Sequence, residues 1–233
     1  MSRRLLITAL TLFLAACGAP AATPDPTLPI ALDPTAPAPT AAPETLSTPE
    51  TQGDDIRAYK IVPDESTASY RVGEVFINEN NRYNLAIGAT NVVEGEIQLN
   101  FTHPEQSTVG VITVDISTLT SDSSRRDNRI RREWLESTKF PIVTFTPTAV
   151  TGISPTARPG DDIAFQITGD LLIRETTRPA TFEITAKLDG DSLTGTATTT
   201  ILMTDFNFDP PDIAGMLKAE NEAILEFKFV ARP

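Results

Sequence analysis

Residues 93–101 read Val93-Glu94-Gly95-Glu96-Ile97-Gln98-Leu99-Asn100-Phe101, with an apolar residue or glycine at every odd position and a polar residue at every even position. Successive side chains of a β-strand point to opposite faces, so this period of two predicts a strand with one dry and one wet face. The same alternation recurs in residues 163–173, 180–188 and 225–229. Half-buried antiparallel strands have this pattern, and the folded part of the chain is therefore predicted to be all-β.

Further strands extend this prediction over most of the C-terminal part of the chain. Asp189-Gly190-Asp191 is a turn signal that predicts a hairpin, and the many threonines suit β structure. Eight or nine strands with little helix indicate a barrel or a sandwich. The additional strands are expected over residues 58–62, 67–76, 83–89, 108–116, 142–150 and 192–203.

The apolar residues of the alternating stretches would share one dry face, and in a closed barrel that face turns toward a single lumen. Two interpretations stay open at this point, because the same side chains could line a cavity for one slender ligand or fill the interior as a packed core. The candidate lumen residues are Val93, Ile97, Leu99, Phe101, Phe165, Ile167, Leu171, Phe182, Ile184, Leu225 and Phe227.

Residues 1–16 have the layout of a secretory signal peptide: two arginines, an apolar stretch and two small residues. The apolar stretch is far shorter than the roughly 20 residues that a membrane-spanning helix requires. Leu14-Ala15-Ala16-Cys17-Gly18 resembles the lipobox of bacterial lipoproteins, in which the thiol is alkylated by a diacylglycerol before cleavage. Cys17 is the only cysteine, so we expect it to be the acylated mature N-terminus that anchors the protein to the membrane. An ordinary signal peptide with a chance cysteine is the alternative.

Residues 17–56 differ in composition from the rest of the chain. Nine of the 19 prolines fall between Pro20 and Pro49, interleaved with alanine and threonine and without any hydrophobic period. Proline at this density removes backbone donors and blocks helix formation, so we expect a disordered tether. The folded domain is then expected over residues 57–233, a length sufficient to bury a substantial core.

Charge and motifs argue against several function classes. The formal net charge is −12, and it becomes −14 when the two arginines of the signal peptide are removed, which disfavours nucleic acids and anionic bilayer surfaces as partners. His103, the only histidine, precedes a proline and is expected in a loop, and no catalytic or phosphate-binding motif occurs. Asp205, Asn207, Asp209 and Asp212 lack the glycine and the terminal glutamate of a calcium loop. We therefore expect no enzyme, no metal site and no cofactor.

The segment from about Ser123 to Glu136 departs from the strand pattern. Five arginines surround Ile130 and Trp134, which are one helical turn apart, so a short amphipathic helix is predicted. Either this helix is solvated and closes one barrel end with Trp134, or its arginines bind an anionic lipid headgroup or pyrophosphate, with Arg126 and Arg129 as the candidates. Spacing of i,i+4 allows ion pairs along the helix in Asp122–Arg126, Asp127–Arg131 and Arg129–Glu133.

The same segment carries a family resemblance. Residues 126–131, Trp134-Leu135 and residues 139–145, which read Lys-Phe-Pro-Ile-Val-Thr-Phe, resemble the signature of the YceI-like family. The resemblance extends from about Tyr59 to Ala231, and its further pieces are Gly95-Glu96-Ile97 and residues 114–119, 168–179 and 205–207. Where family members often carry a histidine-containing strand, this chain has Tyr70-Arg71-Val72-Gly73-Glu74-Val75-Phe76.

The resemblance implies both a fold and a function. Members of this family resemble lipocalins, with an extended antiparallel barrel whose interior binds polyisoprenoids and related long-chain lipids or quinones. We therefore expect a lipocalin-like barrel of about eight strands with one short helix, which binds, shields or transports an amphiphilic isoprenoid-type lipid or quinone outside the cytoplasmic membrane, in the cell envelope or periplasm. The alternative is a filled-barrel structural or interaction protein of the envelope, related to stress, with no small ligand.

Overall fold

The computed structural model describes residues 53–233. The predicted signal peptide, Cys17 and nearly all of the predicted tether lie outside these residues. The first strand begins at Ile56, and the residues just before it already contact the domain, because the side-chain amide of Asn100 donates to the Asp54 carboxylate at 3.2 Å.

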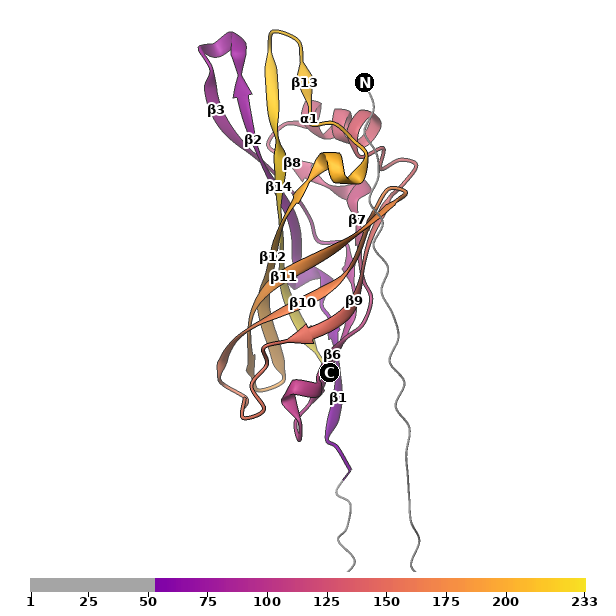
Figure 1. Ribbon diagram of the computed structural model, residues 1–233, viewed down its shortest axis with the longest axis vertical. Coiled ribbons are helices and arrows are strands. Elements are labelled where there is room, and N and C mark those ends of the chain that lie inside the picture. Colours follow the sequence, from indigo (N-terminus) through magenta and orange to yellow (C-terminus); the bar gives the residue numbers. More distant parts are fainter. Residues whose placement is uncertain (1–52) are drawn as a thin grey trace, which may run out of the picture. The chain divides into compact units, whose positions relative to one another are not determined.

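Antiparallel strands make up most of this part of the chain (Figure 1), which confirms the predicted all-β class. The strands are β1 (Ile56–Ile61), β2 (Thr67–Phe76), β3 (Arg82–Thr90), β4 (Val93–Glu94), β5 (Glu96–Asn100), β6 (Thr108–Val109), β7 (Ile112–Asp115), β8 (Thr120–Ser121), β9 (Ile142–Thr151), β10 (Asp162–Ile173), β11 (Thr176–Asp189), β12 (Ser192–Leu202), β13 (Asp212–Ile213) and β14 (Leu217–Arg232). Short helical turns join some of them: η1 (Pro63–Glu65), η2 (Ile77–Glu79), η3 (Pro104–Gln106), η4 (Ile116–Thr118) and η6 (Met203–Phe206).

At one end of the domain the paired strands form a ring. β4 and β5 are one strand interrupted at Gly95, and β6 and β7 are one strand interrupted at residues 110–111. β4 pairs with β7 and β5 with β6, so these segments form a single irregular hairpin. From this hairpin the pairing runs through β9, β10, β11, β12, β14 and β1 and returns to β5. Eight strands counted in this way surround the interior, which confirms the predicted barrel.

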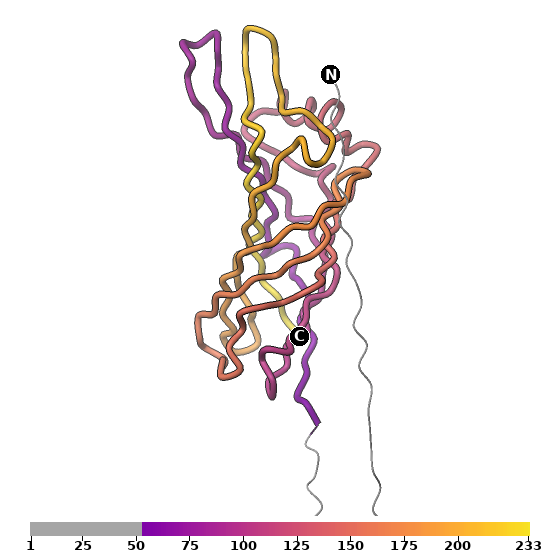
Figure 2. Tube along the Cα trace, in the orientation of Figure 1, coloured from indigo at the N-terminus to yellow at the C-terminus, as the bar shows by residue number. Residues whose placement is uncertain are grey.

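At the other end the ring is open. β14 pairs with β1 only at Ala231 and Arg232, and its pairing with β2 extends from Lys228 to Leu217. β3 pairs with β2 along its length but with β8 at two positions only, and the helix α1 (Ser124–Arg129) packs beside β8. The β2–β3 hairpin and the loop between β13 and β14 extend past the rest of this end (Figures 1 and 2).

The predicted amphipathic helix is present but is not a uniform α-helix. α1 begins after Ser123, whose hydroxyl accepts the backbone N–H of Arg126 at 3.4 Å, and it is followed by the π-helical turn η5 (Ile130–Trp134). The backbone N–H of Leu135 donates to the Ile130 carbonyl at 2.9 Å, the i→i+5 bond of a π-turn. The wider turn allows Ile130, Trp134 and Leu135 to reach the barrel interior together.

The hydrophobic core follows the same division between the two ends. The largest cluster lies among the strands of the ring and includes Tyr59, Ile61, Ile97 and Ile184. A smaller cluster of Val72, Met203, Ala219 and Ala223 lies between β2, β14 and η6, near the open end. Residues of both clusters border one cavity, so side chains do not fill the whole interior.

Candidate functional site

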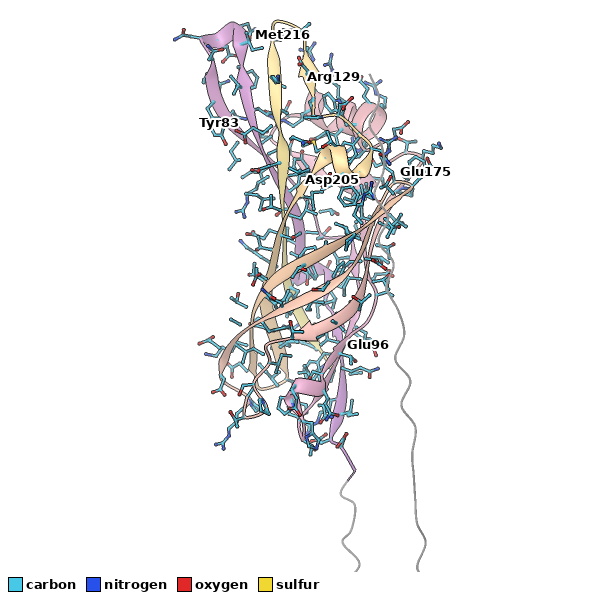
Figure 3. The ribbon with its side chains drawn as sticks, in the orientation of Figure 1. Tyr83, Glu96, Arg129, Glu175, Asp205 and Met216 are labelled. Carbon is cyan, nitrogen blue, oxygen red and sulfur yellow. The ribbon has the colours of Figure 1, made fainter. Side chains whose placement is uncertain are left out.

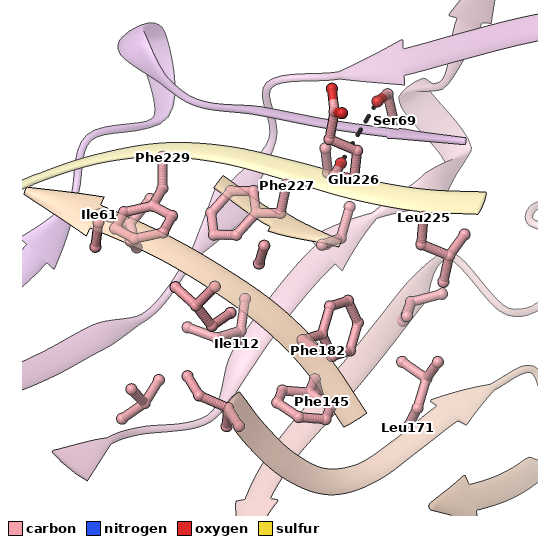
Figure 4. A pocket seen from close by; sticks show the side chains of 18 of the residues that line it. Ile61, Ser69, Ile112, Phe145, Leu171, Phe182, Leu225, Glu226, Phe227 and Phe229 are labelled. Atoms are coloured by element: carbon pink, nitrogen blue, oxygen red, sulfur yellow. Dashed lines mark hydrogen bonds between the residues drawn. The ribbon is translucent and has the colours of Figure 1, made fainter. Parts of the chain in front are cut away.

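The barrel contains a cavity of about 350 Å³. Small-molecule sites in proteins occupy about 300–1,000 Å³, so this space is large enough for a ligand. Most of its lining side chains are aliphatic or aromatic, and nearly every strand of the ring contributes. In Figure 4, Leu225, Phe227 and Phe229 project from β14 into this space, while Ser69 and Glu226, which are also lining residues, lie on the other side of that strand.

The structure brings all but one of the predicted lumen residues to the wall of this cavity. The exception is Val93, which is 1% exposed and belongs to the same core cluster as Tyr59 and Ile61 but does not border this cavity. The wall positions predicted from alternation are Ile97, Leu99, Phe101, Phe165, Ile167, Leu171, Phe182, Ile184, Leu225 and Phe227. Their role in ligand binding remains a prediction.

Phe145 lines the cavity but was not among the predicted lumen residues. Its ring contacts that of Phe182 edge to face, with centroids 4.9 Å apart and planes at 66°. Gly169 makes this position available: a Cβ atom there would lie 2.4 Å from the Thr146 carbonyl oxygen and 2.8 Å from the Phe145 ring. The β9–β10 register also shifts between Thr168 and Gly169. The glycine beside this irregularity therefore leaves room for the Phe145 ring in the cavity wall.

Polar side chains gather near the open end, in a group that we call the polar cluster: Glu74, Asn84, Asp122 and Arg126. Arg126 binds the Glu74 carboxylate in a bidentate manner, with Nε to Oε1 at 3.2 Å and Nη2 to Oε2 at 2.9 Å. Asn84 Nδ2 also donates to Glu74, at 3.3 Å, and Arg126 Nη1 donates to Asp122. The Glu74 and Arg126 side chains are only 7% and 13% exposed, and both border the cavity. Burial disfavours the charge of Arg126, but its bonds to Glu74 and Asp122 outweigh this and raise its pKa.

Tyr70 borders the cavity beside the polar cluster. It pairs across the sheet with Gly88, and its ring occupies the place where a side chain at residue 88 would lie, since a Cβ atom there would be 2.3 Å from the ring. Burial is the main reason why the pKa of the Tyr70 hydroxyl is raised well above its usual range, although the nearby Arg126 charge acts in the opposite direction. The hydroxyl therefore keeps its proton and remains a hydrogen-bond donor.

Only Arg126 of the two headgroup candidates lies at the cavity wall. Arg129 is partly buried on α1 and does not border the cavity; Figure 3 shows it at the helix, near the open end. The predicted pair Asp122–Arg126 forms. Within residues 53–233, the predicted ion pairs of Asp127 with Arg131 and of Arg129 with Glu133 do not form.

Asp127 and Arg131 have other partners, which explains why that pair is absent. The Asp127 carboxylate is buried and accepts the hydroxyl and the backbone N–H of Ser121, at 2.6 and 3.2 Å. Arg131 donates to the carbonyl oxygens of Ser117 and Leu119, at 2.8 and 2.9 Å. These bonds attach the helix to the connection between η4 and β8, so its charged residues position it and are not simply solvated.

Sequence reasoning missed Tyr70 and Glu74 as site residues, although a signal was present. In β2 the side chains of Ala68, Tyr70, Val72 and Glu74 all border the cavity, because alternate residues of a strand share one face. A carboxylate on the same strand face as a series of apolar residues, such as Glu74 in β2, is therefore predicted to lie inside the barrel.

At the end of the barrel where the paired strands form a ring, loop residues also border the cavity: Pro104, Ser107, Arg158 and Asp161. His103 lies in one of these loops, as predicted, next to the carboxylates of Asp54 and Glu105 and not at the cavity wall.

Within residues 53–233, no group of three or more histidine, cysteine, aspartate or glutamate side chains is arranged to hold a metal ion. No helix in this range combines the length and apolar character needed to cross a bilayer.

Comparison with known proteins links these features to a family. Protein YceI of Shigella flexneri and Protein YceI of Escherichia coli O17:K52:H18 are each 31% identical to this chain over 109 residues, or 46% of this chain. The match spans about half the length, 51%, of these curated relatives. Among solved structures, Burkholderia cenocepacia BcnA has a similar fold, with a TM-score of 0.56 at 17% identity over 73% of this chain and 98% of that protein.

A polyisoprenoid binding domain from Saccharophagus degradans, implicated in plant cell wall breakdown, also has a TM-score of 0.56, at 11% identity over 75% of this chain and 97% of that domain. At these identities the two structures establish the likeness of fold alone. The family model for the YceI-like domain matches residues 59–231, so this chain belongs to the YceI-like family.

Proposed function

We propose that this protein binds an amphiphilic long-chain lipid of the polyisoprenoid type, or a quinone with such a chain, inside its barrel and shields or carries it outside the cytoplasmic membrane. The observation that carries the proposal is the cavity of about 350 Å³, whose wall is built from the apolar faces of the alternating strands. A dry wall of this kind favours a hydrocarbon chain because transfer of apolar surface out of water is favourable.

Family membership and fold support the same class of ligand. The similar domain from Saccharophagus degradans is described as polyisoprenoid binding, and its fold matches nearly all of the present barrel. The protein would then act by binding and not by catalysis. In this proposal Cys17 carries the lipid anchor, and the predicted proline-rich tether links it to the barrel in the cell envelope.

The rival proposal, a filled barrel with a structural or interaction role, requires a packed interior. Protein interiors leave few voids larger than a water molecule. A cavity of about 350 Å³ is therefore an argument against a filled barrel.

Purification from native membranes, followed by lipid extraction and mass spectrometry, tests the proposal. The matched control is Ile167→Trp, in which a bulky side chain occupies the cavity from a wall position. We expect a long-chain lipid to copurify with the wild-type protein and to be depleted in the control. Equal, background amounts of lipid in both proteins would contradict the proposal.

A further inference from the structure

The charges around Arg126 bear on which headgroup the cavity accepts. Arg126 is bonded to two carboxylates, Glu74 and Asp122, so the three side chains together carry a net charge of about −1 at neutral pH. Glu74 and Arg126 both border the cavity. A phosphate placed against this pair would meet the Glu74 carboxylate as well as the Arg126 guanidinium bonded to it, so repulsion by the first would oppose attraction by the second.

Desolvation adds to this effect. A phosphorylated headgroup has to leave water to enter the barrel, and such a cost is offset only by well-placed opposite charge or hydrogen-bond donors. Arg126 uses Nε and Nη2 for Glu74 and Nη1 for Asp122 and Ser121. Few of its donors are left to compensate a new anion.

Tyr70 offers the donor that Arg126 does not. Its side chain borders the cavity, and its hydroxyl takes no part in the hydrogen bonds that connect Glu74, Asn84 and Arg126. A protonated hydroxyl beside a mostly apolar cavity is suited to donate one bond to a neutral oxygen.

We propose that the cavity selects lipids with an uncharged headgroup, whose oxygen accepts a hydrogen bond from Tyr70, and that Glu74 disfavours phosphorylated chains. This inference rests on the proposed function, because it assigns the headgroup class for the same cavity.

Three probes of matched chain chemistry test it on the delipidated mature protein: geranylgeraniol, geranylgeranyl diphosphate and squalene. Trp134 is the only tryptophan and borders the cavity, so its fluorescence reports binding without a label. We expect geranylgeraniol to bind at least about tenfold more tightly than the diphosphate. Tyr70→Phe should weaken the binding of geranylgeraniol by up to about tenfold, the effect of one hydrogen bond, and leave the affinity for squalene unchanged. Glu74→Gln should reduce the gap between the alcohol and the diphosphate severalfold.

The control is Tyr83→Phe, which removes a hydroxyl from an exposed tyrosine of β3 and should change none of the three affinities. Equal or tighter binding of the diphosphate to the wild type would overturn the inference while leaving lipid binding intact. If Tyr70→Phe weakened the binding of squalene as much as that of geranylgeraniol, the inference would also be overturned, because the hydroxyl would then act through the shape of the cavity and not through a hydrogen bond. If none of the probes binds the wild type, the proposed function fails and this inference fails with it.

Discussion

Replacing Arg126 with methionine should destabilise the domain more than the loss of a surface ion pair would. The substitution leaves the Glu74 carboxylate 7% exposed, with only the Asn84 amide at 3.3 Å as a partner among its present bonds. Removing one member of a buried pair typically costs about 3–5 kcal/mol, because an uncompensated charge remains. For a domain of this size each kcal/mol lowers Tm by about 2–4 °C, so a loss on the order of 10 °C is expected.

Glu74→Gln should be milder, at about 1–2 kcal/mol, since Arg126 keeps Asp122 and Ser121 as partners and the new amide can still accept a hydrogen bond. The double variant Glu74→Gln/Arg126→Met has no buried charge at this place. It should therefore be more stable than Arg126→Met alone, with a coupling of at least about 1 kcal/mol between the two sites.

The wild type, the two single variants and the double variant form a double-mutant cycle. Equilibrium unfolding in urea at pH 7 measures the free energy of unfolding of all four, provided that the m-value stays constant. Arg132→Met is the matched control, because Arg132 is exposed and its side chain donates only to the Asn128 carbonyl, so its cost should stay within about 0.5 kcal/mol. An Arg126→Met cost below about 1 kcal/mol, or a double variant no more stable than Arg126→Met, would refute the reasoning that the pair is buried and coupled.

Four other outcomes are expected. Ile167→Trp should cost less than the roughly 1–3 kcal/mol of an overpacked core, because the new ring enters free space, and a larger loss in thermal melts would favour a filled interior. Gly169→Ala should lower the urea midpoint markedly, since its Cβ would meet a backbone oxygen at 2.4 Å; an unchanged midpoint would show that the bulge relaxes freely. The raised pKa of Tyr70 favours its neutral form in the folded state, so wild-type stability should decline as pH rises above about 10, and Tyr70→Phe should show a shallower decline in alkaline unfolding titrations. Cys17→Ser should abolish acylation and leave an uncleaved or released form; unchanged detergent partitioning and mature mass would contradict the anchor prediction.

Alternation predicted most of the barrel because one physical cause, a dry inner face, acts on every strand of the ring. The strands expected over residues 163–173 and 180–188 are observed as β10 (Asp162–Ile173) and β11 (Thr176–Asp189), and the turn between β11 and β12 has Gly190 with a φ of +56°. The wall residues followed from the same parity argument. Val93 has the right parity but is buried in the core cluster and does not border the cavity, and periodicity does not show which neighbours will cover a side chain.

The polar part of the site depends on pairings that periodicity does not contain. Glu74 and Arg126 are 52 positions apart and meet only because β2 and α1 both lie at the open end of the barrel. The π-helical turn η5 was not predicted for the same reason, because the local sequence is compatible with both an α-helix and a π-helix. Arg174, in the β10–β11 turn, donates to the Trp134 carbonyl at 3.3 Å and pairs with Glu136, so a distant segment holds the end of this turn.

Strand β14 also determines when the domain can fold. It pairs with β1, β2, β12 and β13, and its pairing of Arg232 with Lys60 joins the last strand of the domain to the first. During synthesis at about 5–20 residues per second, the preceding strands wait for this partner, and the ring cannot close before residues 217–232 have left the ribosome. Non-local pairing of this kind folds slowly because loop-closure entropy has to be overcome first. If the chain is exported, as residues 1–17 predict, this delay would keep the polypeptide unfolded during translocation, and the barrel would form afterwards.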